Sequence, residues 1–433
     1  MIKQISVDGY RLLDGFTAEF RPLTVVIGAN AVGKSTLLDF LQCVSQCADA
    51  PLNTAIGFHG GMLSIANAAA RDRKLKWLIT FVKPENPFWK TLPIEDNLPL
   101  CYEVVLQSDE QGQTLPQYEV LRKREPFPGF EQAFKYLEAT PFRRQIFSKK
   151  DHHFIPFDDV VSKPDGTRDT AIAGNGSQAT LPAPAQEPAL MLSQIRFFNE
   201  FPIPSSARIL LANMAFYTGF DVSRSSTLRT KAAEIKPLTI LFSNGENLGT
   251  VLHEILTRYD YRDTANDLRE FLRAAYTSFE EIHCDTTFGT PAQVLVRLRE
   301  KGMQRSMELW ELSDGMLRFL CLAVALLNPL PPPLVAIDEP EAGLHPKLLP
   351  VVADMIKTGA ERTQVVVTTH SPNLLSRFDI EDVAVMTRGD EIRTRWHRPA
   401  DRKTLVEMLK DVAGDTLGDL LCSGELEALE ASE

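Results

Sequence analysis

The stretch GANAVGKST at residues 28–36 follows the apolar run LTVVI and contains the residue types that bind phosphate. Its spacing fits G-x-x-x-x-G-K-[ST], in which glycines let backbone N–H groups approach a phosphate and the lysine neutralises its charge. A helix that starts at the lysine would add the positive end of its dipole. The pattern predicts that Lys34 contacts the β and γ phosphates of a nucleotide and that Ser35 reaches Mg²⁺. The candidate nucleotide contacts in this loop are Gly28, Asn30, Gly33, Lys34, Ser35 and Thr36.

Two adjacent carboxylates, Asp338 and Glu339, lie at the end of a second apolar run, PLVAI at 333–337. A buried strand ending here would place both at the carboxyl edge of a sheet, where open α/β sheets bind their ligands. In that setting Asp338 would hold Mg²⁺ through water, and Glu339 would polarise the attacking water. Two surface acids that cap a turn are the alternative interpretation.

Two further patterns have both a structural and a functional interpretation. His370 follows the apolar run VVVTT, and a lone histidine at a strand end is often just packed or solvated. Its place one strand beyond the acid pair favours a role near the γ-phosphate. Ser313 and Gly315 precede an apolar helical pattern, where the serine can cap the helix or the two residues can bind an anion.

The elements around these residues predict an α/β protein with a largely parallel core sheet. Helix follows the glycine loop over 34–47, and apolar runs alternate with helical patterns from residue 291 onward, so the two ends of the chain should build one sheet. We expect the N-terminal part of the nucleotide-binding domain at 1–110 and its C-terminal part at 291–433. Between them, 111–290 should hold an insertion and a helical subdomain, with an exposed loop rich in Pro, Gly, Ala, Ser and Thr at 162–188.

Composition narrows the class of protein. The 433 residues are 44% hydrophobic and carry a net charge of −11, which disfavours a chain that coats nucleic acid along its whole surface. The six cysteines form no C-x-x-C pattern, which indicates reduced thiols and makes metal ligation by Cys43 and Cys47 an unfavoured alternative. The sequence contains neither the apolar core of a signal peptide nor about 18 consecutive uncharged apolar residues, so we expect a cytoplasmic protein without membrane contact.

Taken in this order, the four patterns resemble the ABC-type ATPases of the RecF, SMC and OLD kind. Two segments are similar to the stand-alone bacterial ATPases of the OLD and RecF-like AAA group. They are ELSDGMLRFLCLAVALLNPLPPPLVAIDEPEAGLHPKLLP and ERTQVVVTTHS. The resemblance implies ATP and Mg²⁺ as the bound species and a RecF- or SMC-head-like fold with an antiparallel β subdomain. It assigns Walker A to 28–35, the ABC signature to 312–316, Walker B to the strand ending at Asp338, the catalytic glutamate to Glu339 and the switch histidine to His370.

The resemblance also implies a homodimer closed head to head by ATP. Ser313 and Gly315 of one protomer would then contact the γ-phosphate held by the phosphate loop of the other. Gln194 is the first choice for the glutamine that senses Mg²⁺, with Gln145 as its rival. Arg11 matches a basic position that approaches the nucleotide in SMC-type heads.

Two roles for slow ATP turnover follow from these expectations. In the first, the dimer acts on DNA in repair, maintenance or anti-phage defence, and the stretch 121–150, with eight Lys or Arg against three Glu, supplies the contact. A solvated surface insertion is the alternative interpretation of that stretch. In the second role, the dimer is a switch that controls a separately encoded nuclease or toxin without binding DNA itself.

Overall fold

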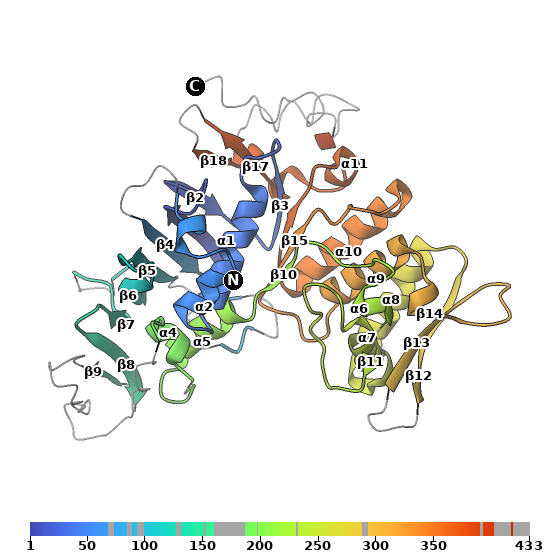
Figure 1. The fold of residues 1–433 in the computed structure, drawn as a ribbon, viewed down its shortest axis with the longest axis horizontal. Helices are drawn as coiled ribbons and strands as arrows, with labels where there is room; N and C mark the ends of the chain where they lie inside the picture. Colours follow the sequence, from blue (N-terminus) through green and yellow to red (C-terminus); the bar gives the residue numbers. More distant parts are fainter. Residues whose placement is uncertain are drawn as a thin grey trace. The chain divides into compact units, whose positions relative to one another are not determined.

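The structure is a computed structural model of the chain. It describes residues 1–67, 73–84, 89–92, 99–126, 131–150, 153–159, 187–196, 198–230, 233–287, 293–389, 393–401 and 417–418. The chain forms two compact units, each assembled from separate segments (Figure 1). Unit 1 comprises Met1–Arg21, Ala29–Met214 and Met386–His397, and unit 2 comprises Pro22–Gly28, Ala215–Val385 and Arg398–Glu433.

Unit 1 is built on an eight-stranded antiparallel sheet in the order β2-β1-β4-β5-β6-β7-β8-β9. In β4, Leu75, Trp77 and Ile79 are fully buried and alternate with more exposed residues, as expected for a sheet with one face in the core. The elements of unit 1 are β1 (Ile2–Asp8), β2 (Phe16–Glu19), α1 (Lys34–Cys47), α2 (Leu52–Gly57), α3 (Met62–Ile65), β4 (Lys74–Phe81), β5 (Leu100–Ser108), β6 (Thr114–Lys123), β7 (Lys135–Ala139), β8 (Arg144–Lys150), β9 (His153–Asp159), α4 (Met191–Gln194), α5 (Pro202–Ala212) and β18 (Thr394–His397).

Unit 2 contains a parallel sheet in which β10 (Ala215–Tyr217), β15 (Leu334–Asp338), β16 (Gln364–Thr368), β3 (Leu23–Ile27) and β17 (Val383–Arg388) are neighbours in that order. Every residue of β3 and β16 is buried, as both faces of a parallel sheet require. Helices α9 (Asp314–Leu326) and α10 (Leu349–Arg362) add to this core, and they approach closely because Gly359 of α10 lies against Leu326 of α9.

The remainder of unit 2 is a small antiparallel sheet with helices packed beside it. Strand β13 pairs with β11, β12 and β14. Helix α8 buries one stripe of side chains, Thr264, Ala265, Leu268 and Leu272, at the spacing of an amphipathic helix. These elements are α6 (Thr227–Thr230), β11 (Ala233–Glu234), α7 (Leu248–Thr257), α8 (Arg262–Ala275), β12 (Phe279–Thr287), β13 (Gln293–Glu300), β14 (Met307–Glu308) and α11 (Pro372–Leu375), with short 3₁₀ turns at Tyr259–Tyr261, Leu309–Glu311, Pro346–Leu348, Ile380–Asp382 and Pro399–Asp401.

The predicted fold class is confirmed. Within the predicted insertion at 111–290, the structure adds strands that the sequence did not indicate. β3, from the N-terminal end of the chain, pairs with β16 and β17 from the C-terminal end, so the two ends do build one sheet. The expected helices at 248–257 and 262–275 are present, but residues 111–159 form the strands β6 to β9. The predicted loop at 162–188 lies outside the described residues, except for its last two. No described helix is long and apolar enough to cross a membrane.

Candidate nucleotide site

The predicted phosphate loop connects β3 to α1. Its backbone turns through positive φ angles at Gly28 (148°), Ala31 (62°) and Gly33 (110°). Alternation of left-handed and ordinary residues makes successive N–H groups converge, which is the geometry of an anion-binding nest. Lys34 is the first residue of α1, is 6% exposed and donates from Nζ to the Ala29 carbonyl at 2.9 Å. The lysine is therefore folded back over the loop that precedes it.

The chemistry of the loop fits a phosphate. Gly33 is the N-cap of α1, and no described side chain caps this helix. Ser, Thr, Asp and Asn are strongly preferred at this position, because their side-chain oxygen accepts a hydrogen bond from the first turn. Because glycine has no side chain, the N–H groups of the first turn can donate to the acceptor oxygens of a ligand instead. A phosphate can also come close to the backbone here, since no Cβ is in its way.

Thr394 of β18 supports the loop from a distant part of the sequence. Its Oγ1 donates to the Val32 carbonyl at 2.7 Å. A Cβ on Gly33 would lie 3.3 Å from the same oxygen. The Thr394 hydroxyl therefore holds the loop in place, and its closeness to Gly33 favours a residue without a Cβ at that position. Sequence analysis missed Thr394, because nothing in the local pattern of β18 signals a contact 362 residues away.

Arg11, in the turn after β1, belongs to a cluster around Asp39, which lies in the second turn of α1. Its Nη1 lies 2.7 Å from Asp39 Oδ2, and its Nη2 donates to the His59 carbonyl. Asp39 also accepts from the Tyr10 hydroxyl at 2.5 Å and lies 2.6 Å from His59 Nδ1. Burial opposes the charge of Asp39, but the hydrogen bonds from His59 and Tyr10 and the charge of Arg11 outweigh it and lower the pKa of Asp39. The structure thus places Arg11 in an ion pair with the helix that follows the loop.

The two predicted carboxylates lie at the carboxyl edge of the parallel sheet. Asp338 ends β15, and the hydroxyl of Thr368, at the end of β16, donates to its Oδ1. Glu339 follows with φ of 49°, a strained value for a residue other than glycine, and its backbone N donates to Thr368 Oγ1 at 3.2 Å. Because β16 also pairs in parallel with β3, Gly28 begins the phosphate loop at this same edge.

His370 lies beside the acid pair. Its Nε2 is 3.9 Å from Glu339 Oε1, and its backbone N donates to Glu341 Oε1 at 3.1 Å. Glu341 Oε1 also accepts from the Thr369 hydroxyl at 2.6 Å, while its Oε2 is buried with no partner among the described residues. Glu341 therefore links the histidine segment to the turn after Asp338, a role that no local sequence pattern indicates. A cavity of about 230 Å³ lies at this edge, lined in part by Asp338, Glu339 and Arg318.

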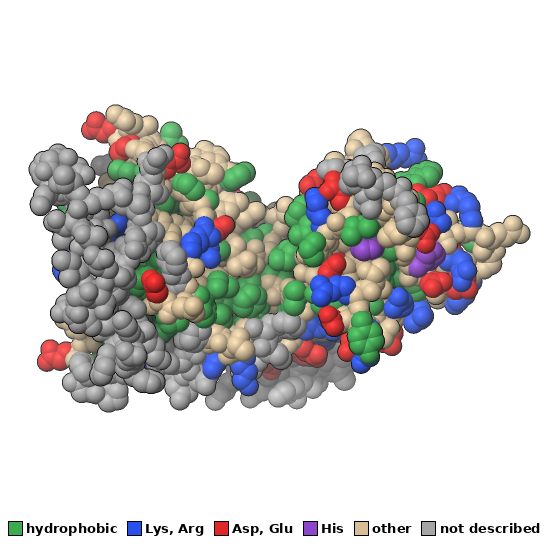
Figure 2. All heavy atoms as spheres, turned by 90° about the horizontal axis from the view of Figure 1, so that it is seen from below, with side chains coloured by type: hydrophobic (Ala, Val, Ile, Leu, Met, Phe, Trp, Pro, Cys, Tyr) green, Lys and Arg blue, Asp and Glu red, His purple; other side chains and the backbone are tan. Residues whose placement is uncertain are grey.

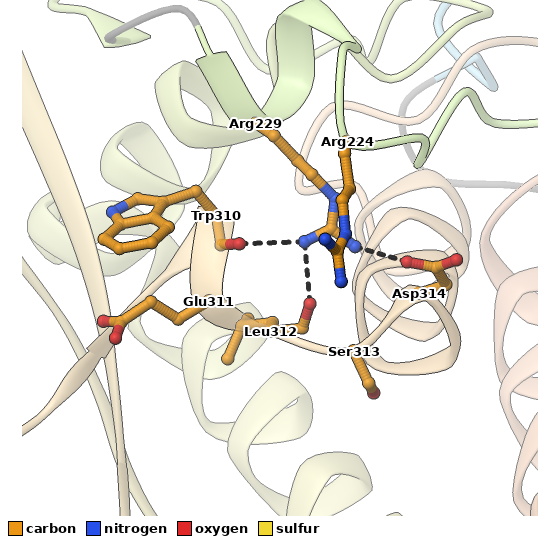
Figure 3. Close-up of a pocket in the computed structure, with 7 residues that line it drawn as sticks. All are labelled: Arg224, Arg229, Trp310, Glu311, Leu312, Ser313 and Asp314. Carbon is orange, nitrogen blue, oxygen red and sulfur yellow. Dashed lines mark hydrogen bonds and ion pairs between the residues drawn. The ribbon is translucent and has the colours of Figure 1, made fainter.

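The predicted signature residues lie at the start of α9. Ser313 is its N-cap, and the Ser313 hydroxyl accepts from Met316 N at 3.3 Å. Figure 3 shows Arg229 reaching this segment from α6. It donates to the carbonyls of Trp310 at 3.0 Å and Leu312 at 2.8 Å, and its Nη2 is 2.5 Å from Asp314 Oδ1. The guanidinium of Arg229 therefore offsets the charge of Asp314.

The two glutamine candidates lie in unit 1. Gln194 ends α4, donates from Nε2 to the Leu190 carbonyl at 3.3 Å, and has a buried Oε1 with no partner among the described residues. It lines a cavity of about 500 Å³ together with Glu119, a buried carboxylate that accepts from the backbone N–H groups of Met191 and Leu192. Gln145 lies on β8, opposite Glu138 of β7. Which of the two senses Mg²⁺ stays a prediction.

Comparisons with known proteins agree with this architecture. The structure is similar to an Smc head bound to the C-winged helix domain of ScpA, with 12% identity and a TM-score of 0.51 over 92% of this chain and 97% of that one. It is also similar to an Smc head with an extended coiled coil bound to the C-terminal domain of ScpA, from Pyrococcus furiosus, with 10% identity and a TM-score of 0.52 over 95% and 99%. These likenesses show the fold of an ABC-type ATPase head.

Among curated proteins, none matches the sequence. Residues 23–376 match the family model described as "AAA domain, putative AbiEii toxin, Type IV TA system". This match includes the phosphate loop, the signature segment, the acid pair and His370, and it covers most of the chain. The protein therefore belongs to this AAA ATPase family, and its fold is that of an SMC head.

Proposed function

We propose that the protein binds and hydrolyses ATP, and that two copies close around the nucleotide. The observation that carries this proposal is a phosphate loop of positive-φ residues that starts at the same sheet edge as Asp338 and Glu339. In this proposal Lys34 and the backbone N–H groups of the loop hold the phosphates, and Asn30 and Thr36 complete the contacts. Adenine as the base follows from the family.

The side chains at the sheet edge activate the attacking water, contact the γ-phosphate and hold Mg²⁺. Glu339 orients and polarises the attacking water, and His370 contacts the γ-phosphate. Ser35 and Asp338 are the residues that would hold Mg²⁺, which neutralises phosphate charge when bound. Their oxygen donors suit this ion, and no described group of three or more His, Cys, Asp or Glu could hold a metal by itself. A magnesium site here therefore relies on phosphate oxygens and water, as Mg²⁺ sites in ATPases do.

The second copy contributes Ser313 and Gly315. Both residues lie at the start of α9, where the helix dipole and an exposed serine hydroxyl suit a terminal phosphate. ATP then holds the dimer together, and its hydrolysis releases the two copies. Family membership supports this arrangement, since two-copy closure is what the ABC-type resemblance implies.

Variants of two residues test the proposal together. Glu339→Gln should keep ATP binding, slow hydrolysis at least about 100-fold and accumulate an ATP-bound dimer, because the amide cannot polarise water. Lys34→Ala should lose ATP binding and remain monomeric. Sedimentation velocity with and without ATP, together with phosphate release, measures all of these properties. A Glu339→Gln protein that binds ATP yet stays monomeric would contradict the closure of two copies.

For the biological role, we propose a switch that controls a separately encoded effector, a toxin or a nuclease, without binding DNA itself. The family description names a putative toxin of a Type IV toxin–antitoxin system, which supports action together with a separately encoded partner. The basic stretch 121–150 supports direct DNA contact less than its composition suggests. Lys123 and Arg144 are buried, and Lys135 pairs with Glu138 at 2.6 Å. Figure 2 shows cationic and acidic side chains interspersed on the face that it presents.

DNA repair or maintenance is the second candidate role, carried by the exposed Arg124 and Arg143 of the same stretch. Binding of the ATP-loaded Glu339→Gln protein to duplex and single-stranded DNA at several salt concentrations separates the two roles. Salt-sensitive binding that is lost in an Arg124→Ala, Arg143→Ala double variant would favour DNA action. Absence of binding, with co-purification of a neighbouring gene product, would favour the switch.

A further inference from the structure

We propose that Arg224 is a phosphate-binding residue that acts across the dimer, reaching the ATP held by the phosphate loop of the second copy. The inference rests on the proposed closure of two copies around ATP. It assigns a ligand to the pocket of Figure 3, a cavity of about 700 Å³ lined by Arg224, Arg229, Trp310, Glu311, Leu312, Ser313 and Asp314. This volume is within the range of small-molecule sites.

Arg229 is fixed as part of the wall of this pocket. Its side chain is 7% exposed and is held by Asp314 and by the carbonyls of Val222, Trp310 and Leu312. With these partners its guanidinium keeps one orientation and orders the segment that leads into Ser313. Arg229 is therefore a positioning residue.

Arg224 differs from Arg229 in the same pocket. Each acidic side chain of the lining already pairs with an arginine: Asp314 with Arg229, and Glu311 with Arg305 at 2.6 Å. Arg224 is exposed and has no ion pair among the described residues. In Figure 3 its guanidinium points into the pocket, beside that of Arg229. Because Asp314 already offsets the charge of Arg229, Arg224 carries a positive charge in this pocket that no described acidic side chain of the lining pairs with, and an anion can pair with it.

The chemistry of the pocket selects a phosphate group. A guanidinium donates two parallel hydrogen bonds to phosphate oxygens, a geometry that an ammonium lacks. Ser313, which faces the partner's nucleotide in the proposed dimer, is part of the same lining. The indole of Trp310 points away, and this residue contributes its carbonyl to the wall. The anion that arrives beside Ser313 on closure is the triphosphate of the second copy.

The test uses the full chain with Glu339→Gln as the background, because hydrolysis then does not remove the dimer. Arg224→Ala and Arg224→Lys are compared with Arg273→Ala, a control that removes an exposed arginine of α8 outside the pocket. Sedimentation velocity gives the ATP concentration for half-maximal dimerisation. A fluorescent ATP analogue, at protein concentrations below those that form dimers, gives the affinity of the single protomer. Thermal unfolding confirms that each variant is folded.

We expect Arg224→Ala to raise the ATP concentration for dimerisation at least about tenfold and to leave single-protomer affinity within about twofold. Arg224→Lys should fall between Arg224→Ala and the background. Dimerisation of Arg224→Ala at the same ATP concentration as Arg273→Ala would overturn the inference. An equal loss of single-protomer affinity would also overturn it, because the arginine would then serve its own chain's nucleotide. If the Glu339→Gln background itself stays monomeric, the proposed closure fails before Arg224 is tested.

Discussion

Thr368 and Asp338 are joined by a hydrogen bond between the ends of two neighbouring parallel strands. The hydroxyl of Thr368 donates to Asp338 Oδ1 and accepts from the backbone N of Glu339 at 3.2 Å. One side chain therefore orients a proposed magnesium ligand and helps to hold the backbone N–H of Glu339, which also donates to the main-chain carbonyl of Thr368 at 3.1 Å. Such outer contacts fix a carboxylate that would otherwise rotate.

Replacement of Thr368 by valine should lower ATP turnover about 10- to 100-fold, because the isosteric side chain keeps the packing of β16 and loses both hydrogen bonds. Phosphate release at saturating ATP measures the effect, and Thr368→Ser, which retains the hydroxyl, is the matched control. The Mg²⁺ concentration needed for half-maximal turnover should rise in the valine variant. Equal turnover in the valine and serine variants would show that Asp338 keeps its orientation without this residue.

Replacement of Thr394 by valine should weaken ATP binding about fivefold, which corresponds to the loss of one hydrogen bond of about 1 kcal/mol. Its hydroxyl donates to the Val32 carbonyl within the phosphate loop. Binding of a fluorescent ATP analogue measures the change. Thr394→Ser should bind like the wild type. Normal affinity in the valine variant would mean that the backbone of the loop holds its shape unaided.

The phosphate loop, the acid pair and His370 could be predicted because each is a short pattern that directly follows an apolar strand. The residues that hold these motifs in place could not be predicted. Arg229 contacts Asp314 from 85 residues away, and Thr394 contacts Val32 from 362 residues away. Contacts between such distant residues are not visible in the local sequence. Arg11 illustrates a different limit. The resemblance gives its proposed role at the nucleotide, but only the structure shows its ion pair with Asp39.

The strands at 114–159 were missed because they lack a clean alternation of apolar and polar residues. In β6 the four residues after Thr114 are all half-buried, and one of them is Pro116. β7 and β8 carry several charged residues, among them Lys135 and Arg144. Sheets with two partly polar faces carry a weak period-two signal, so composition alone indicated a charged insertion.

Asp39 should make the protein sensitive to acid. Its pKa is lowered in the folded state, so the stability that it contributes is fully present above the unfolded value of about 3.9 and is lost as pH falls through the folded pKa. Free energies of unfolding measured in urea from pH 7 to pH 3 should therefore fall more steeply for the wild type than for Asp39→Asn. At pH 7 the variant should be less stable by about 1–3 kcal/mol, since it loses charged hydrogen bonds to His59 and Arg11. Parallel pH profiles would assign the acid sensitivity to other carboxylates.

Arg229 and Asp314 should show rescue in a double-mutant cycle. Arg229→Ala leaves the carboxylate of Asp314 unneutralised at the proposed phosphate contact, so ATP-dependent dimerisation in the Glu339→Gln background should weaken about tenfold or more. Asp314→Ala alone removes a negative charge from this contact and should dimerise at least as well as the background. The double variant should recover part of the loss, because the repulsive charge has gone along with its partner. If the double variant dimerises as poorly as Arg229→Ala, then the hydrogen bonds to the Trp310 and Leu312 carbonyls, and not the charge of Asp314, are the reason that Arg229 is needed.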